Sequence, residues 1–280
     1  EGQYLAPVEL DHVLKPFRDI RDAVGGDIKI ANDGHGKWSL PVAIQIAKEM
    51  EKLDIMWQED LMPLLNPQSL RQLQEATTSP VCISERLLTR WQFREFIENG
   101  AAQIVMPDLI WTGGITETHR IAIMASAHQV PVAPHDATGP VNIFACAQIC
   151  MNSPNAMIME HVRPYLYGWY GEMVDPLPPI ENGWLHAPEN PGIGTRLRPE
   201  VFDRPDVETR VTGVDAMIPG MSDEGWAGVG LYDPKLSTDN FSTAMWSDME
   251  NIFEFRAQES RFEEHFETKT DEGQNAGDSK

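Results

Sequence analysis

Six ionisable residues recur at nearly constant spacing through the middle of the sequence, and their types could support acid–base and metal chemistry. They are Asp33, Glu59, Glu85, Asp108, His135 and Glu160, separated by 26, 26, 23, 27 and 25 residues. Each one ends a short apolar run and is followed by a longer amphipathic stretch. A single charged residue after a strand is ordinarily a solvated loop residue. Six such residues at regular spacing indicate a shared rim at the carboxyl ends of parallel strands, where active sites form in α/β barrels.

The first three of these residues are carboxylates on consecutive repeats: Asp33, Glu59 and Glu85. Carboxylates held at short range repel one another and raise each other's pKa. A hard divalent cation relieves that repulsion, and ligation by oxygen alone favours Mg²⁺ over zinc or copper. The pattern therefore favours a Mg²⁺ site. The structural alternative for each carboxylate is a salt bridge to a neighbouring cation, such as Arg86 beside Glu85.

The next two positions pair a carboxylate, Asp108, with an imidazole, His135. A carboxylate beside histidine orients the ring, fixes its tautomer and raises its basicity. The pair is a candidate general base or acid, with a structural histidine at the rim as the alternative. Glu160 ends the last run, where it could hydrogen-bond a developing oxyanion if protonated or form a salt bridge if ionised.

The elements that would position these residues alternate between strand-like and helix-like segments. Strands are predicted at 27–33, 54–59, 81–85, 103–108, 130–135 and 156–160, and helices at 7–24, 40–52, 67–76, 90–99, 115–128 and 140–151. Strands that alternate with helices form a parallel sheet with right-handed crossovers. A (β/α)8 barrel needs eight strands, so we predict an α/β barrel that is incomplete at its N-terminal side, with six of eight strands visible.

Composition excludes several classes of function. The net charge of −21 argues against nucleic acid as a partner, because phosphate binding needs clustered Lys and Arg. No run of about 18 apolar residues is present, and no secretory signal is recognisable, so we expect a cytoplasmic protein without membrane contact. Cys82, Cys146 and Cys150 form no CxxC pair and are expected to be buried free thiols.

Three regions are expected along the chain. Residues 1–162 hold the partial barrel. Residues 163–210 are rich in Pro, Gly and aromatic residues, with little periodicity, and are predicted to be an ordered loop extension that packs on the barrel or on a cap. Residues 211–280 contain 15 acidic and 5 basic residues and are predicted to be a weakly ordered acidic tail.

The order Asp, Glu, Glu, then Asp and His, then Glu resembles the enolase superfamily, in its mandelate racemase-like subgroup. Local motifs carry the same resemblance: DGHGKW (33–38), WQED (57–60), PD (107–108), GGITE (113–117) and PHDATGP (134–140). The segment VRPYLYGWYGEMVDPL (162–177) and the later PGIG (191–194) look most like sugar-acid dehydratases. The resemblance covers roughly residues 7–205.

The resemblance implies Mg²⁺-assisted removal of the proton α to a carboxylate, through an enediolate. It makes Asp33, Glu59 and Glu85 the metal ligands and the Asp108–His135 pair the base or acid. Glu160 would hydrogen-bond the carboxylate side of the intermediate. His35 resembles the histidine that protonates the leaving group in some acid-sugar dehydratases, with a supporting structural role as the alternative.

We therefore expect Mg²⁺-dependent dehydration of an aldonate or aldarate to a 2-keto-3-deoxy acid. A racemase or cycloisomerase on the same scaffold would share the metal and dyad residues. An inactive remnant is the third reading, because we expect the chain to lack the family's N-terminal capping domain and first two barrel strands. The expected partner is a small sugar acid. A homo-oligomer is left open, since dimers and octamers are common in the resembled family.

Overall fold

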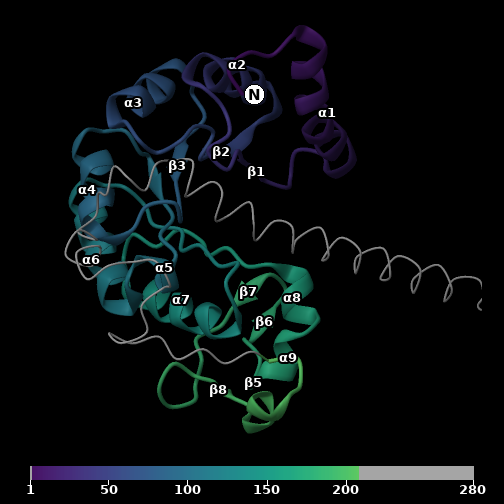
Figure 1. Cartoon of the computed structure of the whole chain (residues 1–280), viewed down its shortest axis with the longest axis vertical. Helices are drawn as coiled ribbons and strands as arrows, with labels where there is room; N and C mark the ends of the chain where they lie inside the picture. The colour runs from purple at the N-terminus through teal and green to yellow at the C-terminus, as the bar shows by residue number, and fades with distance from the viewer. Residues whose placement is uncertain (1, 208–280) are drawn as a thin grey trace, which may run out of the picture. The chain divides into compact units, whose positions relative to one another are not determined.

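Strands and helices alternate along the computed structural model of the chain, which describes residues 2–207 (Figure 1). The helices of the alternating part are α1 (Pro7–Val24), α2 (Leu40–Met50), η1 (Glu51–Leu53), α3 (Pro67–Ala76), α4 (Thr89–Glu98), α5 (Leu109–Thr112), α6 (Gly114–Ala127) and α7 (Pro140–Asn152). The strands are β1 (Ile30–Asp33), β2 (Ile55–Glu59), β3 (Val81–Ile83) and β4 (Ile104–Val105). The predicted tail, 211–280, lies outside the described residues.

The four strands form one parallel sheet in the order β1-β2-β3-β4. Asp33 lies opposite Glu59 in the register, and Glu59 lies opposite Cys82. Helices α2, α3, α4 and α6 follow one another along the outer side of an arc, and strands β1, β2 and β3 lie on its inner side (Figure 1). This arrangement confirms the predicted parallel α/β fold for the described residues.

The strands predicted at 130–135 and 156–160 are wrong as continuous strands. The sheet continues there only through the single parallel bridges Val105–Val132, Asp108–His135 and Val132–Ala156. Pro131 and Pro134 have no N–H to donate, and therefore the ladder breaks on both sides of Val132. The chain still runs in the sheet direction, because the N–H of Ala133 bonds to Val105 O and that of Met157 to Val132 O.

Local sequence signals explain where helices begin and end. Helix α1 has the predicted bounds and ends at Gly25, whose φ of 69° suits glycine. The Asn66 side chain caps α3 by accepting hydrogen bonds from the backbone N–H groups of Gln68 and Ser69 at 2.9 and 3.1 Å. The short helix α5 was not predicted; it begins where the Asp108 carboxylate caps the turn after β4.

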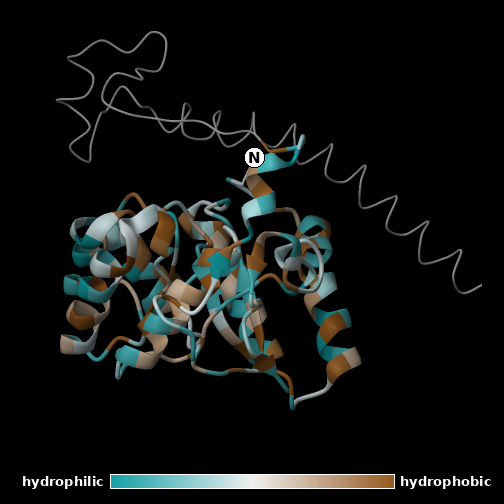
Figure 2. Ribbon diagram, turned by 90° about the horizontal axis from the view of Figure 1, so that it is seen from below, coloured by the Kyte–Doolittle hydropathy of each residue, from teal (hydrophilic) through white to brown (hydrophobic). Residues whose placement is uncertain are grey.

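The main hydrophobic core lies between the sheet and its outer helices. It includes Ile46 and Met50 of α2, Leu73 of α3 and Phe93 of α4, each nearly or fully buried. Figure 2 shows apolar and polar residues alternating along the helices, as expected where one helix face packs on a sheet. The three cysteines are free; Cys82 and Cys146 are buried and Cys150 is partly buried.

The segment after residue 162 contains more regular structure than the sequence predicts. It forms α8 (Arg163–Tyr167), α9 (Tyr170–Met173), two antiparallel pairs and a final turn, η2 (Pro199–Asp203). The pairs join β5 (Val174–Asp175) with β8 (Arg196–Leu197), and β6 (Ile180–Glu181) with β7 (Trp184–Leu185). These pieces of two to five residues are too short for a periodic pattern to reveal. Leu166 and Tyr170 pack against Ile143 of α7.

Glu117, from the GGITE motif, joins helices α4 and α6. Its carboxylate accepts hydrogen bonds from the Arg90 backbone N–H at 2.9 Å, from the Arg90 guanidinium, and from Arg120 at 3.3 Å. Burial works to raise the pKa of Glu117, but these donors outweigh it and hold the pKa below its ordinary value. The carboxylate therefore stabilises the fold above its unfolded-state pKa, and that contribution is lost as the pH falls.

Glu117→Gln is expected to lower the free energy of unfolding at neutral pH by about 1–3 kcal/mol, because a neutral amide replaces a charge-assisted acceptor. Denaturant unfolding at several pH values measures this. The difference from the native protein should shrink in acid. Glu98→Gln on α4 is the control, since its pair with Arg94 is exposed. Equal losses for the two variants would contradict the prediction.

Candidate active site

The carboxyl ends of the strands bring most of the predicted chemical residues to one rim. Asp33 and Glu59 end β1 and β2 as register partners, and Glu85 follows β3 by two residues. Asp108 and His135 face each other across a parallel bridge. Glu160 is tied to the same edge by its backbone N–H, which bonds to Pro134 O at 3.1 Å.

The Asp108–His135 pair is formed as predicted. His135 Nδ1 lies 2.7 Å from Asp108 Oδ2, and both residues are buried. The second carboxylate oxygen, Oδ1, accepts the backbone N–H groups of Ile110 and Trp111. Thr138 Oγ1 also donates to Oδ2, at 3.1 Å. The aspartate is therefore fixed by its own helix cap, and it fixes the imidazole so that Nε2 faces the rim.

Two further carboxylates face His135 Nε2. Glu160 Oε2 lies 3.6 Å from it and Glu85 Oε2 lies 3.8 Å from it. Burial works to lower the pKa of His135, but the hydrogen bond with Asp108 and the charges of Glu160 and Glu85 raise this pKa to about 9. The imidazole is thus more basic than that of an ordinary histidine, because carboxylates surround it, and it can hold a proton at Nε2.

Glu85 lies between two imidazoles. Its Oε1 is 3.7 Å from His35 Nε2, and its Oε2 faces His135. His35 Nε2 is also 3.4 Å from Asp33 Oδ2. The His35 side chain is 59% exposed, whereas that of Glu85 is 4% exposed. The rim therefore offers one buried and one open histidine on either side of a buried carboxylate.

Asp33 and Glu59 complete the acidic rim. Burial and then the charges of Asp33, Asp60 and Glu160 raise the pKa of Glu59 to about 8. Trp57 Nε1 donates to Glu59 Oε2 at 3.1 Å, which orients the carboxylate. Burial also raises the pKa of Asp33, and Glu85 adds to this rise while His35 opposes it. The site holds more negative charge than its own cations neutralise.

The types of residue at this rim suit a metal ion, but the arrangement of their side chains does not form a ligand group. Among residues 2–207, no three His, Cys, Asp or Glu side chains are arranged to hold a metal ion. The carboxylates of Asp33 and Glu85 both lie near His35 Nε2. Asp33 is linked to Glu59 only through its charge, which contributes to the raised pKa of Glu59. Mutually repelling carboxylates, of which Glu59 and Glu85 are buried, are nevertheless the donor set that a hard divalent cation prefers. The predicted ligands share one rim, but their side chains do not converge as a ligand group.

The sequence reasoning missed residues that shape this rim. The Trp111 ring lies beside His135, with centroids 6.1 Å apart, and 45% of the residue is exposed. Asp60 is buried next to Glu59 and accepts hydrogen bonds from Ser84 N and Oγ at 3.2 and 2.7 Å. Ser84 Oγ also lies 2.5 Å from Glu85 Oε2, and its single proton can be donated to only one of the two carboxylates at a time. Asp60 lies within the WQED motif, and Trp111 lies three residues after the PD motif, and these positions were the available signal.

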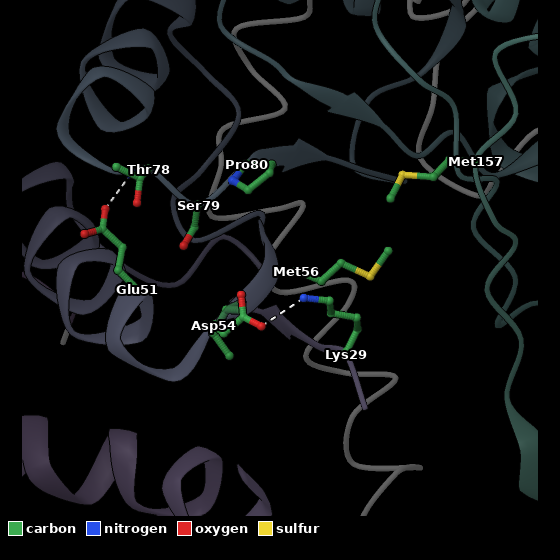
Figure 3. Close-up of a pocket in the computed structure, with 9 residues that line it drawn as sticks. Lys29, Glu51, Asp54, Met56, Thr78, Ser79, Pro80 and Met157 are labelled. Atoms are coloured by element: carbon green, nitrogen blue, oxygen red, sulfur yellow. Dashed lines mark hydrogen bonds and ion pairs between the residues drawn. The ribbon is translucent and has the colours of Figure 1, made fainter. Parts of the chain in front are cut away.

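A separate hollow of about 390 Å³ opens at the amino ends of the strands (Figure 3). Glu51 accepts the Thr78 backbone N–H there, and Lys29 pairs with Asp54 at 2.9 Å. None of the rim residues described above lines it. Residues at the amino-terminal end of a barrel usually contribute to stability rather than to catalysis. The candidate site therefore remains the rim at the carboxyl ends of the strands.

Comparison with known proteins identifies the family. Residues 4–201 match the family described as "Enolase C-terminal domain-like", and the chain belongs to it. The chain is 39% identical to an enolase of the mandelate racemase subgroup from Agrobacterium tumefaciens, with a TM-score of 0.68 over 72% of this chain and 55% of that one. An enolase protein from Sargasso Sea environmental sequencing is 35% identical, with a TM-score of 0.70 over 73% and 55%.

Curated relatives include two dehydratases. The chain is 32% identical to the D-xylonate dehydratase of Haloferax volcanii, over 70% of this chain and 47% of that protein. It is 30% identical to the D-galactonate dehydratase of Variovorax paradoxus, over 70% and 52%. The chain thus spans about half the length of the curated relatives it matches. In residues 2–207, no helix is long and apolar enough to span a bilayer.

Proposed function

We propose that this chain carries the catalytic rim of a Mg²⁺-dependent sugar-acid dehydratase. The substrate would be an aldonate or aldarate, and the product a 2-keto-3-deoxy acid. The single observation that carries the proposal is the Asp108–His135 dyad, with Nδ1 bound to the aspartate and Nε2 facing the acidic rim. The dehydratase relatives support the sugar-acid class.

In the proposed reaction the neutral form of His135 accepts the C2 proton at Nε2 while Asp108 holds the ring. His35, on the other side of Glu85, donates a proton to the departing 3-hydroxyl, which leaves as water. For a substrate of opposite stereochemistry the two histidines would exchange roles, so that His35 accepts the C2 proton and His135 donates a proton to the departing 3-hydroxyl. Glu160 lies beside His135 Nε2 and would hydrogen-bond the carboxylate side of the enediolate. The enol then tautomerises to the keto acid.

Asp33, Glu59 and Glu85 are the residues that would hold Mg²⁺. When bound, the cation would position the substrate carboxylate and stabilise the negative charge of the enediolate. The residues of the chain would supply the remaining functions: the dyad moves the proton, and the half-exposed Trp111 ring beside His135 limits water access from that side.

The proposal is tested by incubating the full chain with Mg²⁺ and a panel of sugar acids that includes D-xylonate and D-galactonate. We expect one or more to yield a 2-keto-3-deoxy acid, detected by its carbonyl chemistry and by mass loss of one water. Isomerisation without loss of water would instead identify a racemase or cycloisomerase. Absence of any conversion, with Mg²⁺ bound, would indicate a non-catalytic remnant, and either result would overturn dehydration.

A further inference from the structure

Four buried oxygen atoms close to the dyad have no hydrogen-bond partner within the described part of the chain. They are Asp136 Oδ1 and Oδ2, Asn142 Oδ1 and Tyr170 Oη. All three residues are at most 1% exposed. They come from three segments: the loop after the dyad, helix α7, and helix α9, which packs on α7 through Tyr170 and Ile143. None of them has a role in the proposed reaction.

Asp136 and Asn142 contact the catalytic groups directly. The Asp136 backbone N–H donates to Glu160 Oε2 at 3.2 Å. Asn142 Nδ2 donates to the carbonyl of His135 at 3.2 Å and lies 3.4 Å from Asp108 Oδ2. The positions of these two residues therefore affect the positions of His135, Asp108 and Glu160, through the Asp136 backbone and the Asn142 side chain.

Asp136, Asn142 and Tyr170 are linked by electrostatics and by packing, and no direct hydrogen bond joins their side-chain oxygens. Burial raises the pKa of Asp136 to about 7, and the nearby Asn142 amide opposes this rise, although no hydrogen bond of ordinary geometry joins the two. Tyr170 packs on Ile143, the residue that follows Asn142 in α7. Burial and then the charge of Asp136 raise the pKa of Tyr170. The hydroxyl is thus within electrostatic reach of the carboxylate.

The donor and acceptor capacities of these atoms match one water molecule. A tyrosine hydroxyl donates one hydrogen bond, whereas a carboxylate and an amide oxygen only accept. A water that accepts from Tyr170 and donates to Asp136 and to Asn142 Oδ1 gives each residue a partner. Buried waters typically make about three hydrogen bonds to groups that otherwise lack partners. Leaving such groups unpaired is destabilising, because each has given up its hydrogen bonds to bulk water.

We propose that Asp136, Asn142 and Tyr170 bind one buried water, and that this cluster positions His135 and Glu160 from behind. Through Tyr170, the segment that follows residue 162 helps to position the residues of the active site. The inference rests on the proposed function only in treating His135 and Glu160 as the groups that act on substrate. The three members are positioning residues, since they are buried and would act through His135, Asp108 and Glu160 rather than on the substrate itself.

A crystal structure of the full chain is the direct test. We expect one ordered water within hydrogen-bond distance of Asp136, Asn142 and Tyr170 Oη, and we expect it to be displaced or lost in Tyr170→Phe. Direct hydrogen bonds among the three side chains, with no water between them, would overturn the proposal.

A double-mutant cycle tests the coupling in solution. Tyr170→Phe and Asp136→Asn are each expected to lower the urea midpoint of unfolding, and the double variant to lower it by less than the sum of the two shifts. Tyr167→Phe is the matched control, because it removes an exposed hydroxyl from the same segment. Its effect should add to that of Asp136→Asn. Additive shifts in both cycles would overturn the coupling.

The imidazole ¹⁵N resonances of His135 report whether the cluster positions the dyad. Tyr170→Phe is expected to shift them, and Tyr167→Phe to leave them in place. Unmoved resonances in Tyr170→Phe, with the cycle coupled, would overturn the positioning role. None of these measurements requires turnover, so failure of the dehydratase assay leaves them interpretable and separates the two proposals.

Discussion

Replacing His135 by asparagine is expected to lower the rate of sugar-acid dehydration by about 10²- to 10⁴-fold, the usual contribution of a positioned acid or base. Asparagine removes the group that holds a proton at Nε2, while its amide can still hydrogen-bond Asp108. The loss should fall mainly on kcat, because the imidazole acts on the reacting proton rather than on ground-state binding. Steady-state kinetics with Mg²⁺ and the best substrate of the panel measure both constants.

His128→Asn is the control for this prediction. His128 is exposed at the end of α6 and belongs to none of the rim contacts, and therefore its replacement should leave kcat unchanged. A His135→Asn variant with native kcat would remove His135 from the reaction. A loss confined to KM would assign His135 to substrate binding instead of proton transfer.

Glu59→Gln is expected to abolish stabilisation by Mg²⁺ and to make the metal-free protein more stable in alkali. A ligand at 100 times its Kd adds about 2.7 kcal/mol to the free energy of unfolding, and the variant should lose most of this gain. The second effect follows from the pKa of Glu59, which burial and the Asp33, Asp60 and Glu160 charges raise to about 8. Denaturant unfolding with and without Mg²⁺ measures both effects.

The direction of the pH effect follows from the raised pKa. The folded protein binds a proton at Glu59 more tightly than the unfolded chain does, and therefore native stability declines as the pH rises from the ordinary pKa of 4.5 to about 8. Glu59→Gln does not titrate and escapes this loss, which is on the order of a few kcal/mol. The two proteins should differ most above about pH 8 and least in acid.

Glu75→Gln is the matched control, since Glu75 is an exposed carboxylate paired with Arg71 on α3. It should retain both the Mg²⁺ response and the native pH profile. An undiminished Mg²⁺ response in Glu59→Gln would exclude Glu59 as a ligand. Isothermal titration with Mg²⁺ gives an independent measure of the same loss.

The order of strands and helices could be read from the sequence because it depends on local patterns. Helix α1 has the predicted bounds, and the Asn66–Pro67 start of α3 follows from capping chemistry alone. The two strands predicted beyond β4 are wrong in extent. The prediction rested on apolar content, whereas the prolines at 131 and 134 lack the N–H groups that a continuous ladder of hydrogen bonds needs. The short helices and pairs after residue 162 are too brief for periodicity to show.

By itself, the sequence determined which residues share the rim. Strands of a parallel sheet all end on the same side, so regular spacing places Asp33, Glu59, Glu85, Asp108 and His135 together. Only the tertiary structure decided how these side chains are paired. It bonds His135 to Asp108, places Glu85 between two imidazoles and leaves the predicted metal ligands unconverged. It also buries Tyr170 against Ile143 of α7. Such contacts depend on side-chain directions and burial across distant segments, which spacing along the chain does not encode.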